Sequence, residues 1–106
     1  MAPQSFTPQS ADRAARRLEP LARRVCAGYR HLREAAPDPV VEGPVPGDYF
    51  RALRRFHGDA LRLAAEGVRF RDLSRGWFEF PCREGGRAKR LQWRLGGVWD
   101  EPGEVP

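Results

Sequence analysis

Apolar residues recur at alternating steps of four and three over the first third of the chain. Their positions are Ala11, Ala15, Leu18, Ala22, Val25, Tyr29 and Leu32. This a/d heptad spacing predicts one long helix over residues 6–36 with one side committed to burial. Thr7 and Pro8 form a typical helix start, an N-cap followed by a proline at the first helical position. The apolar phase continues through Pro20, so we expect a kink there rather than a break.

A second helical pattern lies beyond a proline-rich stretch. Residues 36–47 contain four prolines and two glycines, which predicts an extended connection over residues 37–47. The next helix is expected over residues 48–66, ending at a left-handed Gly67 and packing antiparallel against the first. Gly58, in its middle, indicates either close approach of the two helix backbones or a neutral substitution. The apolar positions of this helix are Tyr49, Phe50, Leu53, Phe56, Ala60, Leu61 and Ala64.

After Gly67 the apolar period changes from helical to two, which is typical of strands. The residues that share a face are, strand by strand, Val68 and Phe70, then Phe78 and Phe80, then Leu91, Trp93 and Leu95. Turns are expected over residues 72–76, 83–87 and 96–97, the second around Gly85-Gly86. We therefore predict a three-stranded antiparallel β-meander over residues 68–100, with a short fourth strand at residues 98–99 as an option. Residues 101–106 are expected to form a disordered tail.

The pattern as a whole predicts a single α+β domain over residues 1–106, a helical hairpin covered by the meander. A chain of 106 residues supports only a modest core, and oligomers are common near this size. The apolar seam of the first helix also exceeds what one short partner helix covers, so we expect a homodimer through helices or sheet.

Composition indicates a cytoplasmic protein. No apolar run is long enough to span a bilayer, and the start of the chain lacks a signal-peptide pattern. The two cysteines lie far apart in sequence and are interpreted as free thiols, with Cys26 on the apolar stripe as a small hydrophobic residue.

Positive charge concentrates on the meander. Residues 68–99 hold eight basic side chains against three acids, which equals the net charge of +5 for the whole chain. Strand parity places a basic surface with one aromatic opposite the apolar face. Its candidate residues are Arg69, Arg71, Trp77, Arg90, Gln92 and Arg94, with Glu79 among them. Such a surface suits a protein partner or, by phosphate neutralisation and base stacking, a single strand of nucleic acid. The ordinary alternative is a solvated strand face with Trp77 partly covered by an arginine.

Candidate catalytic residues are few. His57 lies at helical spacing from Leu53 and Leu61, which places it at or beside the buried seam as a structural histidine. Asp72 and Glu79 are its conceivable carboxylate partners in a functional polar cluster. The cysteines and histidines show no metal-ligand spacing, and no serine lies in a nucleophile elbow. The sequence thus predicts no catalytic residue, metal or cofactor.

Three stretches carry a family resemblance: Phe6-Thr7, Tyr49-Phe50 through Phe56-His57, and the meander with its Gly67-Val68, Arg71-Asp72, Gly76, Phe80-Pro81, Gly86-Arg87 and residues 91–96. They resemble the uncharacterised bacterial family known as domain of unknown function 2203. The resemblance implies a long helix, a second helix with a Phe-His pair and a small meander. The chain departs from the family pattern near its end. It has Leu91-Gln92-Trp93 for Leu-Cys-Trp, Gly96-Gly97 for Gly-Glu, and Trp99-Asp100 near the place of a later Trp-His.

These observations favour a small non-enzymatic binding or assembly protein that uses the basic face of its meander. Single-strand nucleic-acid binding is the alternative, and a metal-dependent enzyme is a distant third. We expect a protein partner or a second copy of the chain and no membrane association.

Overall fold

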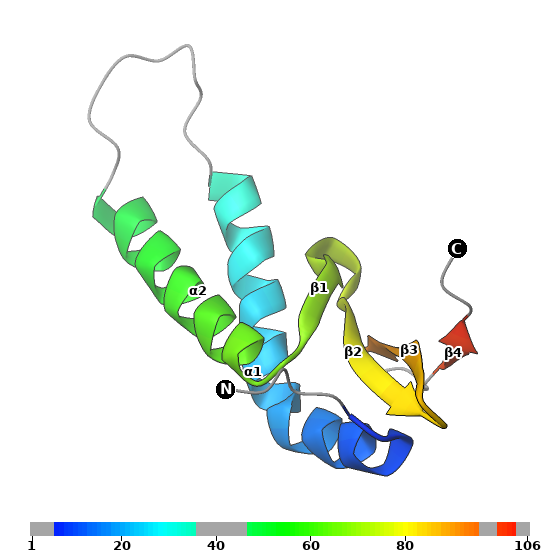
Figure 1. The fold of residues 1–106 in the computed structure, drawn as a ribbon. Helices are drawn as coiled ribbons and strands as arrows, with labels where there is room; N and C mark the ends of the chain where they lie inside the picture. Colours follow the sequence, from blue (N-terminus) through cyan, green and yellow to red (C-terminus); the bar gives the residue numbers. More distant parts are fainter. Residues whose placement is uncertain (1–5, 36–46, 96–99, 104–106) are drawn as a thin grey trace.

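Two helices precede an antiparallel sheet in the computed structural model, which describes residues 6–35, 47–95 and 100–103 (Figure 1). The sheet order follows the chain order, so the strands form a meander. The elements are α1 (Pro8–Ala35), α2 (Gly47–Ala65), β1 (Arg69–Asp72), the 3₁₀ turn η1 (Leu73–Arg75), β2 (Trp77–Glu84), β3 (Arg87–Arg94) and β4 (Asp100–Gly103). The predicted α+β class, a helical hairpin followed by a meander, is confirmed.

Helix α1 begins as its sequence predicts. The Thr7 backbone N–H donates to Ser10 Oγ at 2.9 Å, and the Ser10 N–H donates back to Thr7 Oγ1 at 3.1 Å. This reciprocal cap satisfies donors that the first helical turn leaves without partners. The helix then continues through Pro20 without interruption. In Figure 1 its blue N-terminal part runs below the sheet and its cyan C-terminal part turns upward beside α2. One bent helix therefore packs against the sheet with its first part and against α2 with its second.

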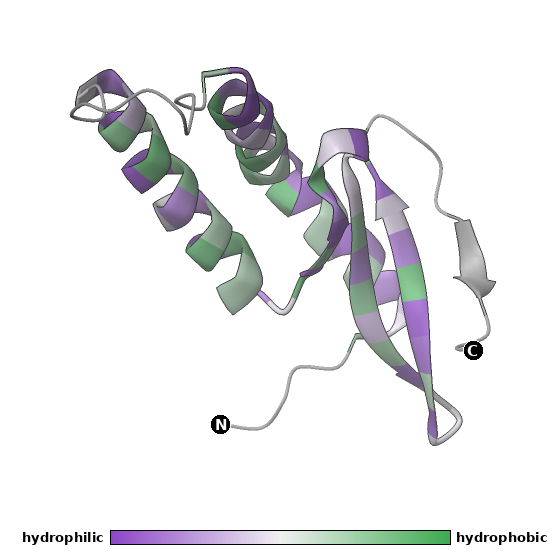
Figure 2. Ribbon diagram, turned by 90° about the horizontal axis from the view of Figure 1, so that it is seen from above, coloured by the Kyte–Doolittle hydropathy of each residue, from purple (hydrophilic) through white to green (hydrophobic). Residues whose placement is uncertain are grey.

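The core lies between α1 and the inner face of the sheet. Small residues of the α1 seam, Ala11, Ala15 and Ala22, are buried against the sheet cluster of Phe78, Phe80, Leu91 and Trp93. The Phe80 ring lies 5.4 Å from Trp93 and 4.8 Å from Phe6, measured between ring centroids. Alanines on the helix leave room for these large rings. The predicted inner face of β2 and β3 is therefore confirmed, and Figure 2 shows hydrophobic and hydrophilic residues following one another along the two long strands.

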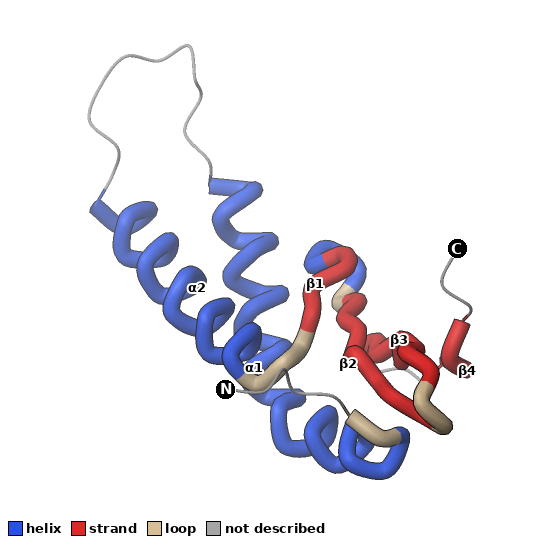
Figure 3. Tube along the Cα trace, viewed as in Figure 1, coloured by secondary structure: helices blue, strands red, loops and turns tan. Residues whose placement is uncertain are grey.

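The strand connections match their sequence signals. Gly85 and Gly86 have φ angles of 59° and 78° and join β2 to β3 as a two-residue hairpin loop, which requires positive φ at both positions. Between β1 and β2 the chain makes the turn η1, drawn in blue between red strands in Figure 3. The segment before α1 also joins the sheet, because the Phe6 N–H donates to the Pro81 carbonyl at 2.9 Å.

The tail differs from its prediction. Residues 101–103, expected to be disordered, belong to β4, which pairs with β3 through Gln92↔Asp100 and Arg90↔Gly103. Extended backbone beside the free edge of β3 gains main-chain hydrogen bonds whatever its side chains, so composition alone gives no signal for this strand. The predicted reversal at residues 96–97, the optional strand at 98–99, the connection over 37–46 and residues 104–106 lie outside the described residues.

The contact between the helices lies elsewhere than expected. A Cβ at Gly58 would meet nothing within 4 Å, so of the two alternatives for Gly58 the close approach is excluded. The close approach is at Gly28 of α1, where a Cβ would lie 3.3 Å from the Phe56 ring. Because Gly28 has no side chain, Phe56 of α2 can pack directly on the α1 backbone.

Candidate binding surface on the sheet

The strand register gathers the predicted basic residues on the sheet face that points away from α1. Arg69 of β1 lies opposite Glu79 of β2, and Glu79 in turn lies opposite Gln92 of β3. Trp77 of β2 lies opposite Arg94. Since the neighbouring positions Phe78 and Phe80 are fully buried on the inner side, period-two alternation puts these residues on the outer side. We call this surface the outer face; it comprises Arg69, Arg71, Trp77, Glu79, Arg90, Gln92 and Arg94.

Trp77 lies at the centre of a clamp built from three strands. The guanidinium carbon of Arg71 lies 5.1 Å from the ring centroid, and that of Arg94 lies 4.7 Å from it. Both are cation–π distances. The indole Nε1–H donates to the Gln92 side-chain oxygen, which fixes the ring orientation. Trp77 is half-buried as a result, and its arginine neighbours are held in place by the ring they cover.

The exposed charge on the outer face is positive. Arg69, Arg71 and Arg94 are exposed, while Arg90 and Gln92 are half-buried. Within the described part of the chain, Arg69 and Arg71 have no carboxylate partner. Exposed guanidinium groups that are not paired with carboxylates attract anionic partners.

Glu79 is the unusual member of the outer face. Only 5% of this residue is exposed, and its Oε2 atom has no hydrogen-bond partner among the described residues. A buried carboxylate oxygen without a hydrogen-bond partner is costly. The sequence pattern identified the face of Glu79 correctly but gave no sign that the residue is buried.

The predicted polar cluster of His57, Asp72 and Glu79 is not assembled. Among the described residues, no hydrogen bond or ion pair joins His57 to either acid. The predicted burial of His57 is wrong, because it is exposed on α2. The spacing argument placed it correctly on the side of Leu53 and Leu61, but that side faces outward, with Leu53 38% and Leu61 57% exposed.

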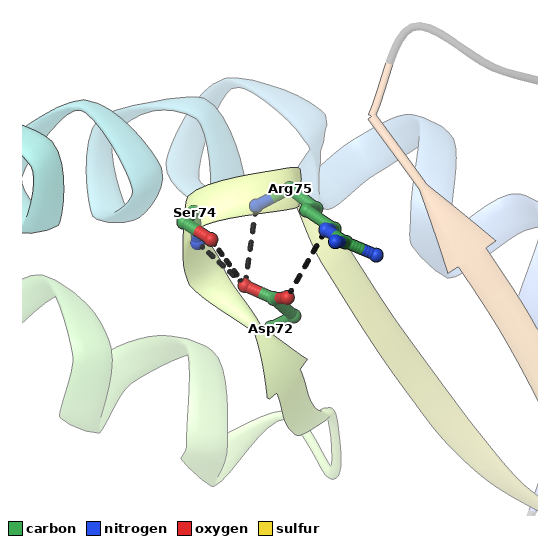
Figure 4. A network of polar contacts seen from close by, with 3 residues as sticks. All are labelled: Asp72, Ser74 and Arg75. Atoms are coloured by element: carbon green, nitrogen blue, oxygen red, sulfur yellow. Dashed lines mark hydrogen bonds and ion pairs between the residues drawn. The ribbon is translucent and has the colours of Figure 1, made fainter.

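Asp72 is committed to the turn η1 (Figure 4). Its Oδ1 accepts from the Ser74 hydroxyl at 2.5 Å and from the Ser74 N–H at 3.0 Å. Its Oδ2 lies 3.6 Å from Arg75 Nε. The hydrogen bond from the Ser74 hydroxyl is the main reason that the pKa of Asp72 is lowered, with the backbone donors of the turn adding to it. A carboxylate satisfied in this way is a structural cap rather than a general base.

Both cysteines are buried and unbridged, and Cys26 packs on the helix stripe as predicted. Burial raises the pKa of the Cys26 thiol, against a smaller opposing effect of the Arg30 charge. Within residues 6–35, 47–95 and 100–103, no three His, Cys, Asp or Glu side chains are grouped to hold a metal ion. No helix in these ranges is long and apolar enough to cross a membrane.

The sequence interpretation missed one group of side chains. Arg23 and Arg30 of α1 line a groove together with Arg75 of η1. The seven-residue step from Arg23 to Arg30 puts both on one side of the helix, but helical spacing alone does not indicate a groove there. Only the tertiary packing of α1 against η1 brings Arg75 to them.

Comparison with protein-family models, with curated proteins and with solved structures gives no match for this chain. The resemblance to domain of unknown function 2203 therefore stays a prediction, and function has to be argued from the geometry.

Proposed function

We propose that this chain is a non-enzymatic binding module whose outer face holds an acidic segment of a protein partner. The clamp of Arg71, Trp77 and Arg94 carries the proposal, because it presents two guanidinium groups in fixed positions. Fixing side chains before binding reduces the entropy lost on association. Guanidinium groups also match the planar geometry of carboxylates.

The same clamp makes binding of single-stranded nucleic acid the second candidate function. Sheets that bind single strands stack bases on open aromatic rings, usually two or three of them. Here Trp77 is the aromatic residue of the outer face, and arginines from both neighbouring strands lie over it. Phosphates would still be attracted, but base stacking would first require the clamp to open. A metal-dependent enzyme ranks third, since His57 and the two acids are apart.

The binding test uses two double variants with the same change in net charge. Poly-L-glutamate is the acidic probe, and its affinity for Arg71→Gln/Arg94→Gln is expected to fall about tenfold, since each lost charge contact contributes roughly 0.7 kcal/mol. The control, Arg13→Gln/Arg62→Gln, removes two exposed helical charges and should retain most of the affinity. Equal loss in both variants would show that only net charge matters.

A thymidine oligonucleotide separates the two partner classes. Stacking of a base on an indole ring quenches its fluorescence, so a Trp77-dependent quenching stronger than any effect of poly-L-glutamate would favour the nucleic-acid alternative. The proposal expects the oligonucleotide to bind by charge alone, with affinity lost steeply as salt rises.

We also propose that the protein forms a homodimer, through α2. The α1 seam that suggested a dimer is covered within the chain by the sheet and α2. Three large apolar side chains of α2 are instead exposed, Phe50 at 51% together with Leu53 and Leu61. An outward apolar stripe at helical spacing is typical of a subunit contact. The outer face is a poor dimer contact, because it would place arginines against arginines.

Sedimentation of Leu61→Glu tests the dimer. The wild type is expected to sediment as a dimer and Leu61→Glu as a monomer, since a buried unpaired charge opposes association. The neighbouring exposed change Arg62→Glu should leave the dimer intact. A monomeric wild type at high protein concentration would end this proposal.

The setting that fits these proposals is the bacterial cytoplasm. Two buried free thiols suit a reducing compartment. Secretion of the mature chain with Cys26 and Cys82 oxidised would contradict this assignment.

A further inference from the structure

We propose that the groove between α1 and η1 binds a small molecule that carries a phosphate group. The groove has a volume of about 390 Å³, within the range of small-molecule sites. Its polar walls are Arg23 and Arg30 on one side and Arg75 on the other, and no carboxylate is among the described residues that line it. It lies on the helix side of the sheet, so it is distinct from the outer face.

Part of the hydrogen-bonding capacity of Arg30 and Arg75 remains unused. Arg30 donates through Nε to the Cys26 carbonyl at 3.4 Å, and Arg75 Nε lies 3.6 Å from Asp72. Among the described residues the terminal nitrogens of these two arginines have no hydrogen-bond partner. A guanidinium held by its Nε edge keeps its other donors available for a phosphate.

The third arginine adds charge from the same side of the helix. Arg23 lies two helical turns before Arg30, and its ion pair with Glu19, at 3.4 Å, is exposed on both sides. Exposed pairs of this kind are weak, so Arg23 can exchange this partner for a ligand. An adjoining hollow is lined by Arg30, Arg33, Glu34 and Ser74, and its single acid offsets only one of its two arginines.

The remaining lining indicates a ligand larger than a free anion. Ala27, Gly76 and Leu95 supply an apolar floor, which would contact a non-polar part of the ligand. A Cβ on Gly76 would lie 3.2 Å from Leu95, so the missing side chain lets Leu95 pack directly on the turn and close the floor. The Cys26 thiol also lines the groove and, with its raised pKa, carries no negative charge at neutral pH that would offset the arginines.

Phenyl phosphate, which joins a phosphate to an apolar ring, is the probe for this groove. In an NMR titration at low salt we expect it to bind at least about tenfold more tightly than inorganic phosphate, since burying the ring adds apolar contact. Arg30→Gln and Arg75→Gln should each weaken it about tenfold, as loss of a charge-assisted hydrogen bond does. The exposed control Arg13→Gln should bind like the wild type.

Three results would overturn the inference: no saturable binding of phenyl phosphate, equal affinity for phenyl phosphate and inorganic phosphate, or equal loss in Arg13→Gln. A thymidine oligonucleotide that binds more tightly than phenyl phosphate and depends on Arg30 and Arg75 would assign the groove to a nucleic-acid strand instead. Arg71→Gln/Arg94→Gln should leave phenyl phosphate binding unchanged, so the groove and the outer face are tested independently.

Discussion

Phe80→Ala is expected to lower the free energy of unfolding by about 3–5 kcal/mol, the usual loss for a large aromatic side chain removed from a core. Phe80 is fully buried and contacts both Phe6 and Trp93. Its removal would leave a cavity between the sheet and the rigid α1 helix, which cannot collapse easily. For a domain whose total stability is about 5–15 kcal/mol, the variant should be close to unfolding. Urea denaturation followed by circular dichroism measures the change.

Phe50→Ala is the matched control for this prediction. It deletes the same atoms from a side chain that is 51% exposed. With both phenylalanine changes made in the monomeric Leu61→Glu background, so that loss of a dimer contact does not contribute, Phe50→Ala should lower the free energy of unfolding by less than about 1 kcal/mol. Similar losses for Phe50→Ala and Phe80→Ala would mean that the core is not centred between α1 and the inner sheet face.

Glu79→Met is expected to raise the free energy of unfolding by about 1–3 kcal/mol, the cost of a buried polar group without a partner. Methionine has a similar length and lacks the charge, so it should fit the same space. Glu79→Gln should have a smaller effect, because an amide remains polar. Glu34→Met, at an exposed position of α1, is the control and should change stability little.

A lower stability of Glu79→Met would contradict this account of the outer face, since it would mean that the carboxylate is satisfied. A gain in stability accompanied by weaker binding of poly-L-glutamate would show that Glu79 is kept for the arrangement of the arginines rather than for folding. Natural proteins commonly retain such costs at functional surfaces.

Local patterns in the sequence predicted most of the fold. The heptad steps of α1, its Thr7 cap and the continuous phase through Pro20 all depend on residues close together in sequence. The period-two residues of β2 and β3 and the Gly85-Gly86 hairpin are equally local. These signals placed the predicted helix boundaries within two residues of those observed, 8–35 and 47–65.

The sequence-based predictions were wrong where the outcome depends on how the helices and strands pack together. Spacing showed that His57 shares a side of α2 with Leu53 and Leu61, but it could not show which side of the helix meets α1. Whether Gly28 or Gly58 lies at the close contact depends on where the two helices cross. The apolar patterns of α1 and α2 do not indicate that crossing point. Edge pairing likewise brought residues 101–103 into β4 through backbone groups that carry no side-chain signal.

For the two candidate binding surfaces, too, local patterns predicted some features and tertiary packing determined the others. Strand alternation alone placed Arg69, Trp77 and Gln92 on one face of the sheet, so the outer face could be predicted. The double covering of Trp77 depends on Arg71 and Arg94 reaching it from separate strands. The groove of Arg23, Arg30 and Arg75 could not be predicted at all, because it exists only where α1 meets η1.

The central claim is that the clamp of Arg71, Trp77 and Arg94 is the contact for an acidic segment. The most direct measurement is a ¹⁵N NMR titration of the wild type with poly-L-glutamate, observing the Trp77 indole Nε1–H and the arginine Nε–H signals. The account predicts that the signals of Trp77, Arg71 and Arg94 shift together and saturate, while those of Arg13, Arg62 and the buried Trp93 indole stay in place. Saturable shifts confined to α1 or α2, with the Trp77 signal unmoved, would contradict it.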